Sequence, residues 1–256
     1  MTETLYMIHG MWGGPWCWDE YLAYFSALGY SCHTPTLLYH DMTPGAKPDE
    51  RLGTTSLLDY AEALEKEIRQ LPERPILIGH SMGALLAQML AARNLASAVV
   101  LLTPSAPAGI LGLRLSLIRS FLSAHMKWGF WGKPMLQTLG EAHYSMLHRL
   151  TPEQQKSIIA RLVPDSGRAM VEAGHWYLDR QHATRVDEAK VTCPVLVIAG
   201  EEDRITPASI VRKVARKYHA DYKEFPGHAH WVLAEPGWEE IAGYVADWLK
   251  QLPKDN

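Results

Sequence analysis

The sequence predicts an α/β fold with a mostly parallel central sheet that is flanked by helices. Short apolar segments of strand length alternate along the chain with longer segments whose apolar residues recur at helical spacing. Strands that alternate with helices are joined by crossovers, and crossovers of this kind give a parallel sheet covered on both faces. The 256 residues, 47% hydrophobic and 21% charged, suit one globular domain or a core with an inserted part.

The expected elements of the core follow one another in a regular order. Strands are expected at 5–8, 31–34, 75–78, 98–102, 195–199 and 222–225, and helices at 18–28, 56–70, 82–93, 207–217 and 238–252. The helix at 56–70 has its apolar residues at helical spacing and its charged residues on the other face. A loop rich in Pro, Gly and Asp is expected at 39–54.

The alternation stops between Thr103 and Thr192. We expect no strand in this span, and helices at 110–122, 133–148, 152–163 and 166–179. Residues 1–103 and 193–256 are therefore expected to form the core, and residues 104–192 a helical cap inserted in it. Residues 103–150 hold five Lys and Arg residues and a single acidic residue, Glu141. A solvated basic face is the favoured interpretation, and attraction of an anionic substrate or surface is the alternative.

The most informative motif is G-H-S-M-G at residues 79–83, between an expected strand and an expected helix. A serine in a G-x-S-x-G sequence at a strand-to-helix turn is typical of a nucleophile elbow. Gly79 and Gly83 fit this turn because a Cβ atom at either position would collide with the neighbouring elements. The motif predicts that Ser81 is held in strained backbone at a helix N-terminus, which favours developing negative charge. The pentapeptide taken alone is also compatible with an ordinary glycine-rich turn.

The chain resembles the α/β-hydrolase fold superfamily over nearly its full length. Residues 9–18, H-G-M-W-G-G-P-W-C-W, are similar to the H-G-x-W-x-G-x-W-x-W segment of its esterase and hydroxynitrile lyase branch, although Thr36 stands where many relatives have Asp. The resemblance implies an oxyanion hole formed by the backbone N–H groups of Met11 and Met82. Trp12 is a weaker candidate for the role of Met11. Loss of one such donor typically costs about 10²–10³ in rate.

The same resemblance supplies an acid and a base. Residues 200–207, G-E-E-D-R-I-T-P, match the superfamily pattern G-x-x-D-x-x-x-P, which makes Asp203 the expected acid. Two histidines follow the last strand: His228 lies in a G-H sequence, and His230 lies five residues before Glu235. We favour His230 as the base, with His228 as the alternative. The order Ser81, Asp203, His230 is the order that this fold requires.

These residues predict a serine hydrolase that cleaves an ester or related acyl bond of a small molecule through an acyl-enzyme intermediate. No metal or other cofactor is expected. A C–C hydrolase or hydroxynitrile-lyase-like enzyme on the same triad is an alternative, although Gly10 stands where plant hydroxynitrile lyases of this fold have Thr. A non-catalytic small-molecule binding protein on the same scaffold is another. The expected pocket residues are Trp12, Trp128, Trp131 and Trp176.

Composition and charge limit the kinds of partner and the location that we expect for the protein. The net charge of −3 gives no reason to expect nucleic acid binding, and the three cysteines include no C-x-x-C pair. The sequence shows no secretory leader pattern and no apolar run of about 18 residues, so we expect a cytoplasmic protein without stable membrane insertion. The apolar stretch 110–119, interrupted by arginines, either contacts a membrane surface or packs on the core. Substrate, acyl chain length and oligomeric state are not predicted.

Overall fold

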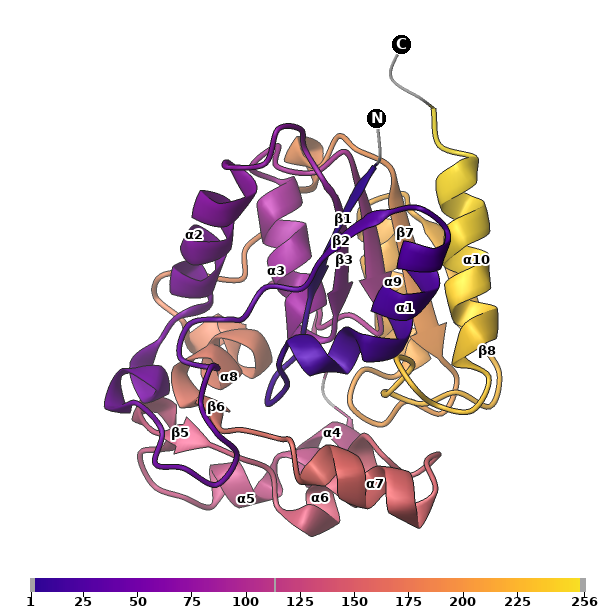
Figure 1. Cartoon of the computed structure of the whole chain (residues 1–256). Helices are drawn as coiled ribbons and strands as arrows, with labels where there is room; N and C mark the ends of the chain where they lie inside the picture. Colours follow the sequence, from indigo (N-terminus) through magenta and orange to yellow (C-terminus); the bar gives the residue numbers. More distant parts are fainter. Residues whose placement is uncertain (1–2, 113, 254–256) are drawn as a thin grey trace.

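The computed structural model describes residues 3–112 and 114–253, and it is built around a parallel sheet of six strands (Figure 1). The strands are β1 (Thr4–Ile8), β2 (Ser31–His33), β3 (Ile76–His80), β4 (Ala98–Leu102), β7 (Val195–Gly200) and β8 (Asp221–Phe225). Their order across the sheet is β2-β1-β3-β4-β7-β8, and every neighbouring pair is parallel. The prediction of an α/β fold with a parallel sheet is confirmed.

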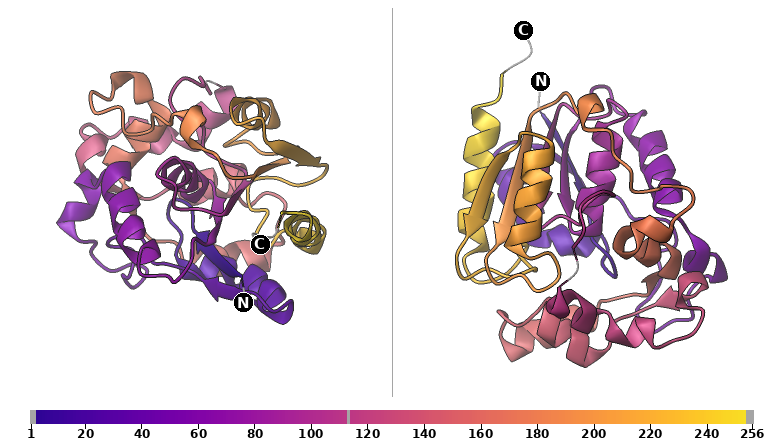
Figure 2. Two further views of the ribbon diagram at one scale, coloured as in Figure 1. Left: turned by 90° about the horizontal axis from the view of Figure 1, so that it is seen from above. Right: turned by 180° about the vertical axis from the view of Figure 1, so that it is seen from behind.

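Helices cover both faces of the sheet (Figures 1 and 2). One face packs against α1 (Asp19–Ala27) and α10 (Trp238–Lys250), and the other packs against α2 (Leu57–Ile68), α3 (Met82–Ala91) and α9 (Ala208–Lys217). Ile76 and Ile78 face the first pair of helices, whereas Leu77 faces the second set. Because side chains alternate along a strand and both faces are buried, the central strands are apolar at nearly every position.

Local sequence signals set the start of α2. Ser56 Oγ accepts the backbone N–H of Leu58 at 3.1 Å, and the Asp59 carboxylate accepts the N–H of Ser56 at 2.8 Å. This reciprocal pair satisfies N–H groups that would otherwise have no partner in the first turn. The helix ends at Ile68, two residues before the expected end, because helix ends fray without a strong stop signal.

The chain between β4 and β7 contains five α-helices within the described residues, and these are shorter than expected. They are α4 (Leu115–Ser120), α5 (Leu122–His125), α6 (Leu139–Ser145), α7 (Pro152–Ile159) and α8 (Gly167–Gly174). The expected helix at 110–122 begins only at α4, where Arg114 is still extended, and Leu113 lies outside the described residues.

The expectation of no strand between Thr103 and Thr192 is wrong. Two short strands, β5 (Pro134–Met135) and β6 (Asp165–Ser166), pair antiparallel. The helix expected from residue 133 therefore starts at α6, behind a capping box formed by Thr138 and Glu141. A two-residue strand has no periodic sequence signal, because its partner lies thirty residues away and only the tertiary structure brings them together.

Residues 104–192 lie at the carboxyl ends of the sheet strands (Figure 1). The helices α4 to α7 form a layer below the sheet in this view, and α8 lies between this layer and α3. In parallel sheets the loops at the carboxyl ends of strands form the usual site for ligands. Among the described residues, no helix is long and apolar enough to cross a membrane.

Candidate active site

Ser81 lies in a sharp turn between β3 and α3, with φ 55° and ψ −117°. A Cβ atom added to Gly79 would lie 2.5 Å from the Cα of Ala84, and one added to Gly83 would collide with the carbonyl oxygen of Ile8. Both glycines are therefore needed for the strand and the helix to approach this closely. A non-glycine residue in this backbone region costs on the order of 1–3 kcal/mol, which the surrounding packing must offset.

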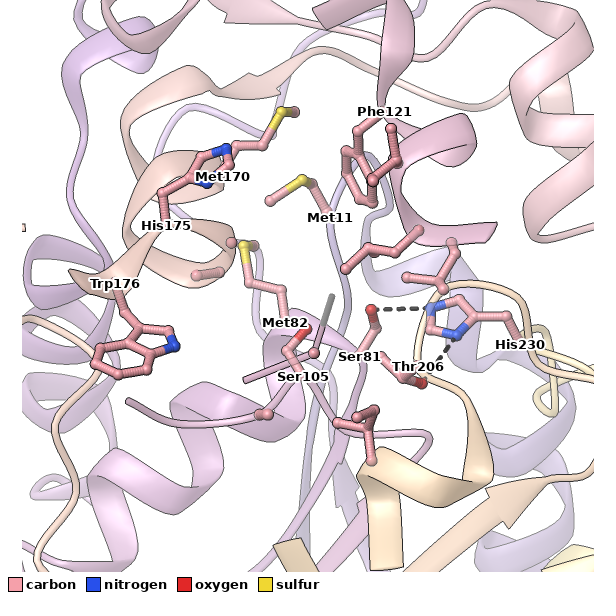
Figure 3. A pocket seen from close by; sticks show the side chains of 18 of the residues that line it. Met11, Ser81, Met82, Ser105, Phe121, Met170, His175, Trp176, Thr206 and His230 are labelled. Atoms are coloured by element: carbon pink, nitrogen blue, oxygen red, sulfur yellow. Dashed lines mark hydrogen bonds between the residues drawn. The ribbon is translucent and has the colours of Figure 1, made fainter. Parts of the chain in front are cut away.

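Three side chains from separate strand ends meet at the carboxyl edge of the sheet. Ser81 Oγ lies 2.9 Å from Nε2 of His230, and Nδ1 of His230 lies 2.8 Å from Oδ2 of Asp203 (Figure 3). Ser81 follows β3, Asp203 follows β7, and His230 follows β8. All three are buried. The structure thus places the three residues in a hydrogen-bonded row that can move a proton from the hydroxyl to the imidazole.

The Asp203 carboxylate is held by four hydrogen bonds. Its Oδ1 accepts the backbone N–H groups of Ile205 and Thr206, each at 2.8 Å, and its Oδ2 accepts the hydroxyl of Thr206 at 2.7 Å and Nδ1–H of His230. Burial acts to raise the pKa of Asp203, but His230 and the bonds from Thr206 outweigh it and lower the pKa. The carboxylate therefore stays ionised and orients the imidazole. Thr206 was not anticipated from the sequence, although the turn that it completes is part of the G-x-x-D-x-x-x-P pattern.

Glu235 fixes the loop that carries His230. Its carboxylate accepts the backbone N–H of Ala229 at 2.7 Å and that of Trp231 at 2.9 Å, on either side of the histidine. His228 does not join the Ser81 row, and its Nδ1 lies 3.4 Å from Glu235 instead. The five-residue spacing between His230 and Glu235 thus has a structural reason. Among the described residues, no group of three or more His, Cys, Asp or Glu side chains is arranged to hold a metal ion.

His80, the variable residue of the G-x-S-x-G sequence, supports the same loop. Burial and the nearby His230 lower the pKa of His80 to about 3, so its ring is neutral at neutral pH. Its Nε2–H donates to the backbone carbonyl of His230 at 2.8 Å, and the hydroxyl of Thr103 donates to the same carbonyl at 3.3 Å. Sequence reasoning missed both residues, because their role depends on a contact across 127 or more positions.

Two backbone N–H groups beside Ser81 have no acceptor within the described part of the chain. They belong to Met11 and Met82, and both residues line the cavity next to Ser81. The N–H of Trp12 is already used, because it donates to Oδ2 of Asp165 at 3.1 Å. The geometry therefore leaves Met11 rather than Trp12 able to donate to a bound oxyanion.

A cavity of about 160 Å³ lies over Ser81 and is bounded on its far side by residues 104–192. Its apolar walls include Met11, Met82, Ile110, Phe121, Met146, Met170 and Ile205. Trp12 and Trp176 line it, as expected for pocket residues. The expectation that Trp128 and Trp131 line the pocket is wrong: they are 86% and 48% exposed and pack edge to face against each other on the surface. The presence of an aromatic residue in the sequence does not reveal whether its side chain points into a pocket or toward solvent.

Comparison with solved structures shows extensive similarity of fold. The methylesterase MES16 from Arabidopsis superposes with a TM-score of 0.74 at 14% identity, covering 98% of this chain and 100% of that one. A pyrethroid hydrolase from Sphingobium faniae JZ-2 gives 0.72 at 16% identity, covering 98% of both chains. Polyneuridine aldehyde esterase gives 0.70 at 16% identity, covering 97% of this chain and 99% of that one.

Among curated proteins, the chain is similar to ABHD8. It is 26% identical to the Bos taurus protein over 223 residues and 25% identical to the Homo sapiens protein over 220 residues. Each match covers 83% of this chain but 48% and 47% of those proteins, so the chain spans about half the length of the curated relatives it matches. The family model for the alpha/beta hydrolase family matches residues 5–243, and the chain therefore belongs to this family.

Proposed function

We propose that the protein is a serine hydrolase that cleaves a carboxylic ester or a related acyl bond of a small molecule. The hydrogen-bonded row of Ser81, His230 and Asp203 at the floor of the cavity carries this proposal. A serine hydroxyl beside an imidazole that is itself held by a carboxylate is the arrangement of an activated nucleophile. Several solved structures that share this fold are of proteins named as esterases or hydrolases, which supports the same chemistry.

The reaction follows from the positions of these atoms. His230 accepts the proton of Ser81 as Oγ attacks the carbonyl carbon, and Asp203 stabilises the imidazolium that forms. The N–H groups of Met11 and Met82 donate to the oxyanion of the tetrahedral intermediate. The intermediate collapses as the alkoxide of the leaving group takes the proton from His230, which leaves an acyl group on Ser81. Water then gives a proton to His230 as it attacks this acyl group, and His230 returns that proton to Ser81 Oγ as the acid is released.

We assign residues 104–192 as a cap that closes the cavity over Ser81. Its contribution to the cavity wall is largely apolar, from Phe121, Met146 and Met170 among others. Methionine side chains adapt to ligands of different shape, which suits a small, mostly apolar acyl or alcohol group. Selection among esters then depends on this wall and not on Ser81, His230 and Asp203.

The test is the activity of Ser81→Ala on p-nitrophenyl acetate and butyrate. We expect the hydrolysis rate to fall by about 10³-fold or more, because the nucleophile is lost. Ser26→Ala, which removes an exposed serine hydroxyl on α1, is the matched control and should keep the parent rate. Parent-level activity in Ser81→Ala would overturn the proposal. A fluorophosphonate probe separates an enzyme from a binding protein, because only an activated Ser81 is labelled stoichiometrically.

A further inference from the structure

The outer side of residues 111–131 exposes an unusual amount of apolar surface. Nine of the fourteen exposed large hydrophobic side chains among the described residues lie between positions 111 and 139. Leu115 and Trp128 are each 86% exposed, and Met126 is 78% exposed. We define the outer cap face as the exposed apolar residues Leu111, Leu115, Ile118, Leu122, Met126, Trp128 and Trp131 together with the basic residues Arg114, Arg119, Lys127 and Lys133. A concentration of apolar side chains of this kind marks an interaction site on a folded protein.

The exposed charges of the outer cap face are positive. Residues 104–140 contain no Asp or Glu, and Glu141, whose carboxylate accepts the N–H of Ser123 at 2.6 Å, is buried. The exposed cations are Arg114, Arg119, Lys127 and Lys133. Among the described residues none of these four forms a salt bridge: Arg114 donates to Ser209 Oγ at 3.1 Å, and Arg119 lies over the ring of Tyr144 at 3.8 Å. The face therefore offers uncompensated positive charge beside exposed aromatic and aliphatic groups.

The cavity over Ser81 opens toward this face. Leu111, Ile118 and His125 line the cavity and are also exposed to solvent. A surface that contacts the outer cap face would thus lie at the entrance of the pocket. Figure 1 shows α4 and α5 at the end of the molecule that is farthest from both termini.

We propose that the outer cap face docks on an anionic lipid bilayer without inserting deeply. Exposed Trp side chains are stabilised at the interface between lipid and water, and each Lys or Arg near an anionic surface strengthens binding by about fivefold. A second copy of the chain fits this face less well. A two-fold symmetric contact would bring the same basic side chains of two copies together, and their charges would repel.

The test uses the full chain carrying Ser81→Ala, so that docking is measured without hydrolysis. It should sediment with vesicles of equal parts phosphatidylcholine and phosphatidylglycerol, and far less with phosphatidylcholine alone or at high salt. The double variant Leu115→Ser/Trp128→Ser should bind at least about tenfold more weakly, and Lys127→Gln about fivefold more weakly. Leu28→Ser, at a residue 46% exposed on the core, is the matched control and should bind as the parent does.

Two results would overturn docking on a bilayer. One is equal sedimentation with both kinds of vesicle, or binding that the double variant leaves intact. The other is a stable dimer in light scattering that Trp128→Ser dissociates, because the face then serves a second copy. Neither Leu115 nor Trp128 lines the cavity, so these substitutions in the active chain should leave hydrolysis of a soluble ester unchanged and report that the variants are folded.

The loop that presents Met11 is attached to residues 104–192 through the next residue, Trp12, which forms three hydrogen bonds with them. Its N–H donates to Asp165 at 3.1 Å, its carbonyl accepts the N–H of Val163 at 3.0 Å, and its indole N–H donates to the carbonyl of Met135 at 3.1 Å. Trp12 also has a φ of 65°, which is costly for a residue other than glycine.

The contact with Asp165 holds this backbone in place. The N–H of Gly13 donates to the carbonyl of Gly10 at 3.3 Å, so Met11 and Trp12 are the central residues of a turn. A positive φ at the second central residue is the mark of a type II turn, which usually has Gly there. In a type I turn the peptide between the two central residues is flipped, and the N–H of Trp12 would point away from Asp165.

The Asp165 carboxylate is itself firmly anchored. It is fully buried and contacts Nε2 of His40 at 3.0 Å, the hydroxyl of Tyr60 at 3.0 Å and the N–H of Ser166 at 2.6 Å. Although burial acts to raise the pKa of Asp165, the neighbouring His40 and the hydrogen bonds lower it. The side chain is therefore a charged anchor in the cap that reaches the loop of the core.

We infer that Asp165 is a positioning residue that keeps the N–H of Met11 aimed at the oxyanion. This inference rests on the proposed function, because it assumes that Met11 donates in the transition state. Asp165→Asn should lower kcat by about tenfold and leave KM within about twofold, since a misplaced donor weakens only transition-state binding. A trifluoromethyl ketone, which adds to Ser81 and mimics the oxyanion, should lose affinity by the same factor as kcat/KM.

The controls separate positioning from general stability. Asp19→Asn, which removes an exposed partner of Arg161, should change neither kcat nor ketone affinity. Tyr60→Phe keeps the Asp165 carboxylate and removes one of its bonds, so it should give a smaller loss of the same kind. Parent-level kcat in folded Asp165→Asn, or a kcat loss without a loss of ketone affinity, would overturn the inference. If Ser81→Ala is inactive while Asp165→Asn matches the parent, only the positioning role fails.

Discussion

The two sides of the cavity differ in how they are built. On the core side, Ser81, Asp203 and His230 lie in the loops that follow the parallel strands β3, β7 and β8, and hydrogen bonds hold their functional atoms. On the cap side, short helices contribute mainly apolar side chains such as Met146 and Met170, and the polar groups there include His125 and His175, whose Nε2 atoms lie 2.8 Å apart. Under the proposed function, the core would therefore set which bond is attacked, and the cap would set which molecules reach Ser81.

Asp165 is the point where the two sides meet. It belongs to β6 of the cap, yet it binds Trp12 and His40 of the core. The core side is thus not wholly independent of the cap, because the loop that carries Met11 rests on a cap carboxylate. Substitutions and pH changes in the core and in the cap should have different effects on activity and stability.

The largest effect is expected at the acid. Asp203→Asn should lower kcat on a p-nitrophenyl ester by about 10⁴-fold, because an amide no longer fixes the tautomer of His230 or stabilises its charge. His228→Asn, two residues from the base and beside Glu235, should keep the parent kcat within about threefold. Steady-state kinetics of both variants check this. A large kcat loss in His228→Asn with a small one in His230→Asn would reverse the assignment of the base.

Substitution of glycine by alanine should destabilise the tightly packed core but not the more loosely packed cap. Gly83→Ala places a methyl group against the carbonyl of Ile8, so the free energy of unfolding should fall by about 3 kcal/mol. Gly140→Ala, in α6 of the cap, meets nothing within 4 Å and should raise stability by about 0.5–1 kcal/mol through helix propensity. Urea unfolding of both variants measures the difference. Equal effects would show that the two regions are packed alike.

The free energy of unfolding should fall at acidic pH because two histidines are buried in the core. Burial lowers the pKa of His9 and of His80 to about 3, whereas the unfolded imidazole titrates near 6.5. Between these values the unfolded chain binds more protons, so stability is fully present above about pH 6.5 and falls by roughly 1.4 kcal/mol per pH unit for each imidazole as pH decreases. Urea midpoints at pH 7 and pH 5 test this. A midpoint that does not fall toward pH 5 would contradict buried neutral histidines.

The contact between His40 of the core and Asp165 of the cap should instead lose its stabilising effect as the pH rises. The pKa of His40 is raised because Asp165 outweighs the effect of burial. A raised histidine pKa contributes stability that is present below the unfolded value of about 6.5 and is lost as pH rises through the folded value. The stability advantage of the parent over His40→Gln should therefore shrink between pH 6 and pH 9. An advantage that is constant with pH would mean that the contact does not depend on the charge of His40.

The smallest effect is expected at the cap wall. Met170→Ala enlarges the cavity opposite Ser81, and should raise KM for a hexanoate ester by about tenfold while kcat changes by less than about twofold. The KM for the acetate ester should change less, because its acyl group is too short to reach this wall. An equal fall of kcat for both esters would indicate that Met170 supports the reacting atoms rather than the acyl chain.

The sequence predicted the core far better than the cap, for physical reasons visible in single residues. The motif at Gly79 and Gly83 depends on a local clash that any chain with this turn must avoid, and it placed Ser81 in the correct turn. Apolar strands such as 98–102 are recognisable because both faces are buried. In the cap, the pairing of β5 with β6 and the exposure of Trp128 depend on neighbours distant in sequence, and both expectations failed there.

Local properties of the chain were enough to predict the parallel sheet and the turn that carries Ser81, because strand periodicity and turn chemistry depend on neighbouring residues. Asp203 and a histidine at 228 or 230 were predicted from the resemblance to the superfamily. Three features required the folded chain: His230 rather than His228 faces Ser81, the N–H of Trp12 donates to Asp165, and Trp128 lies outside the pocket. Each of these depends on which distant groups share a small volume, and hydrophobic pattern and residue spacing carry no such information.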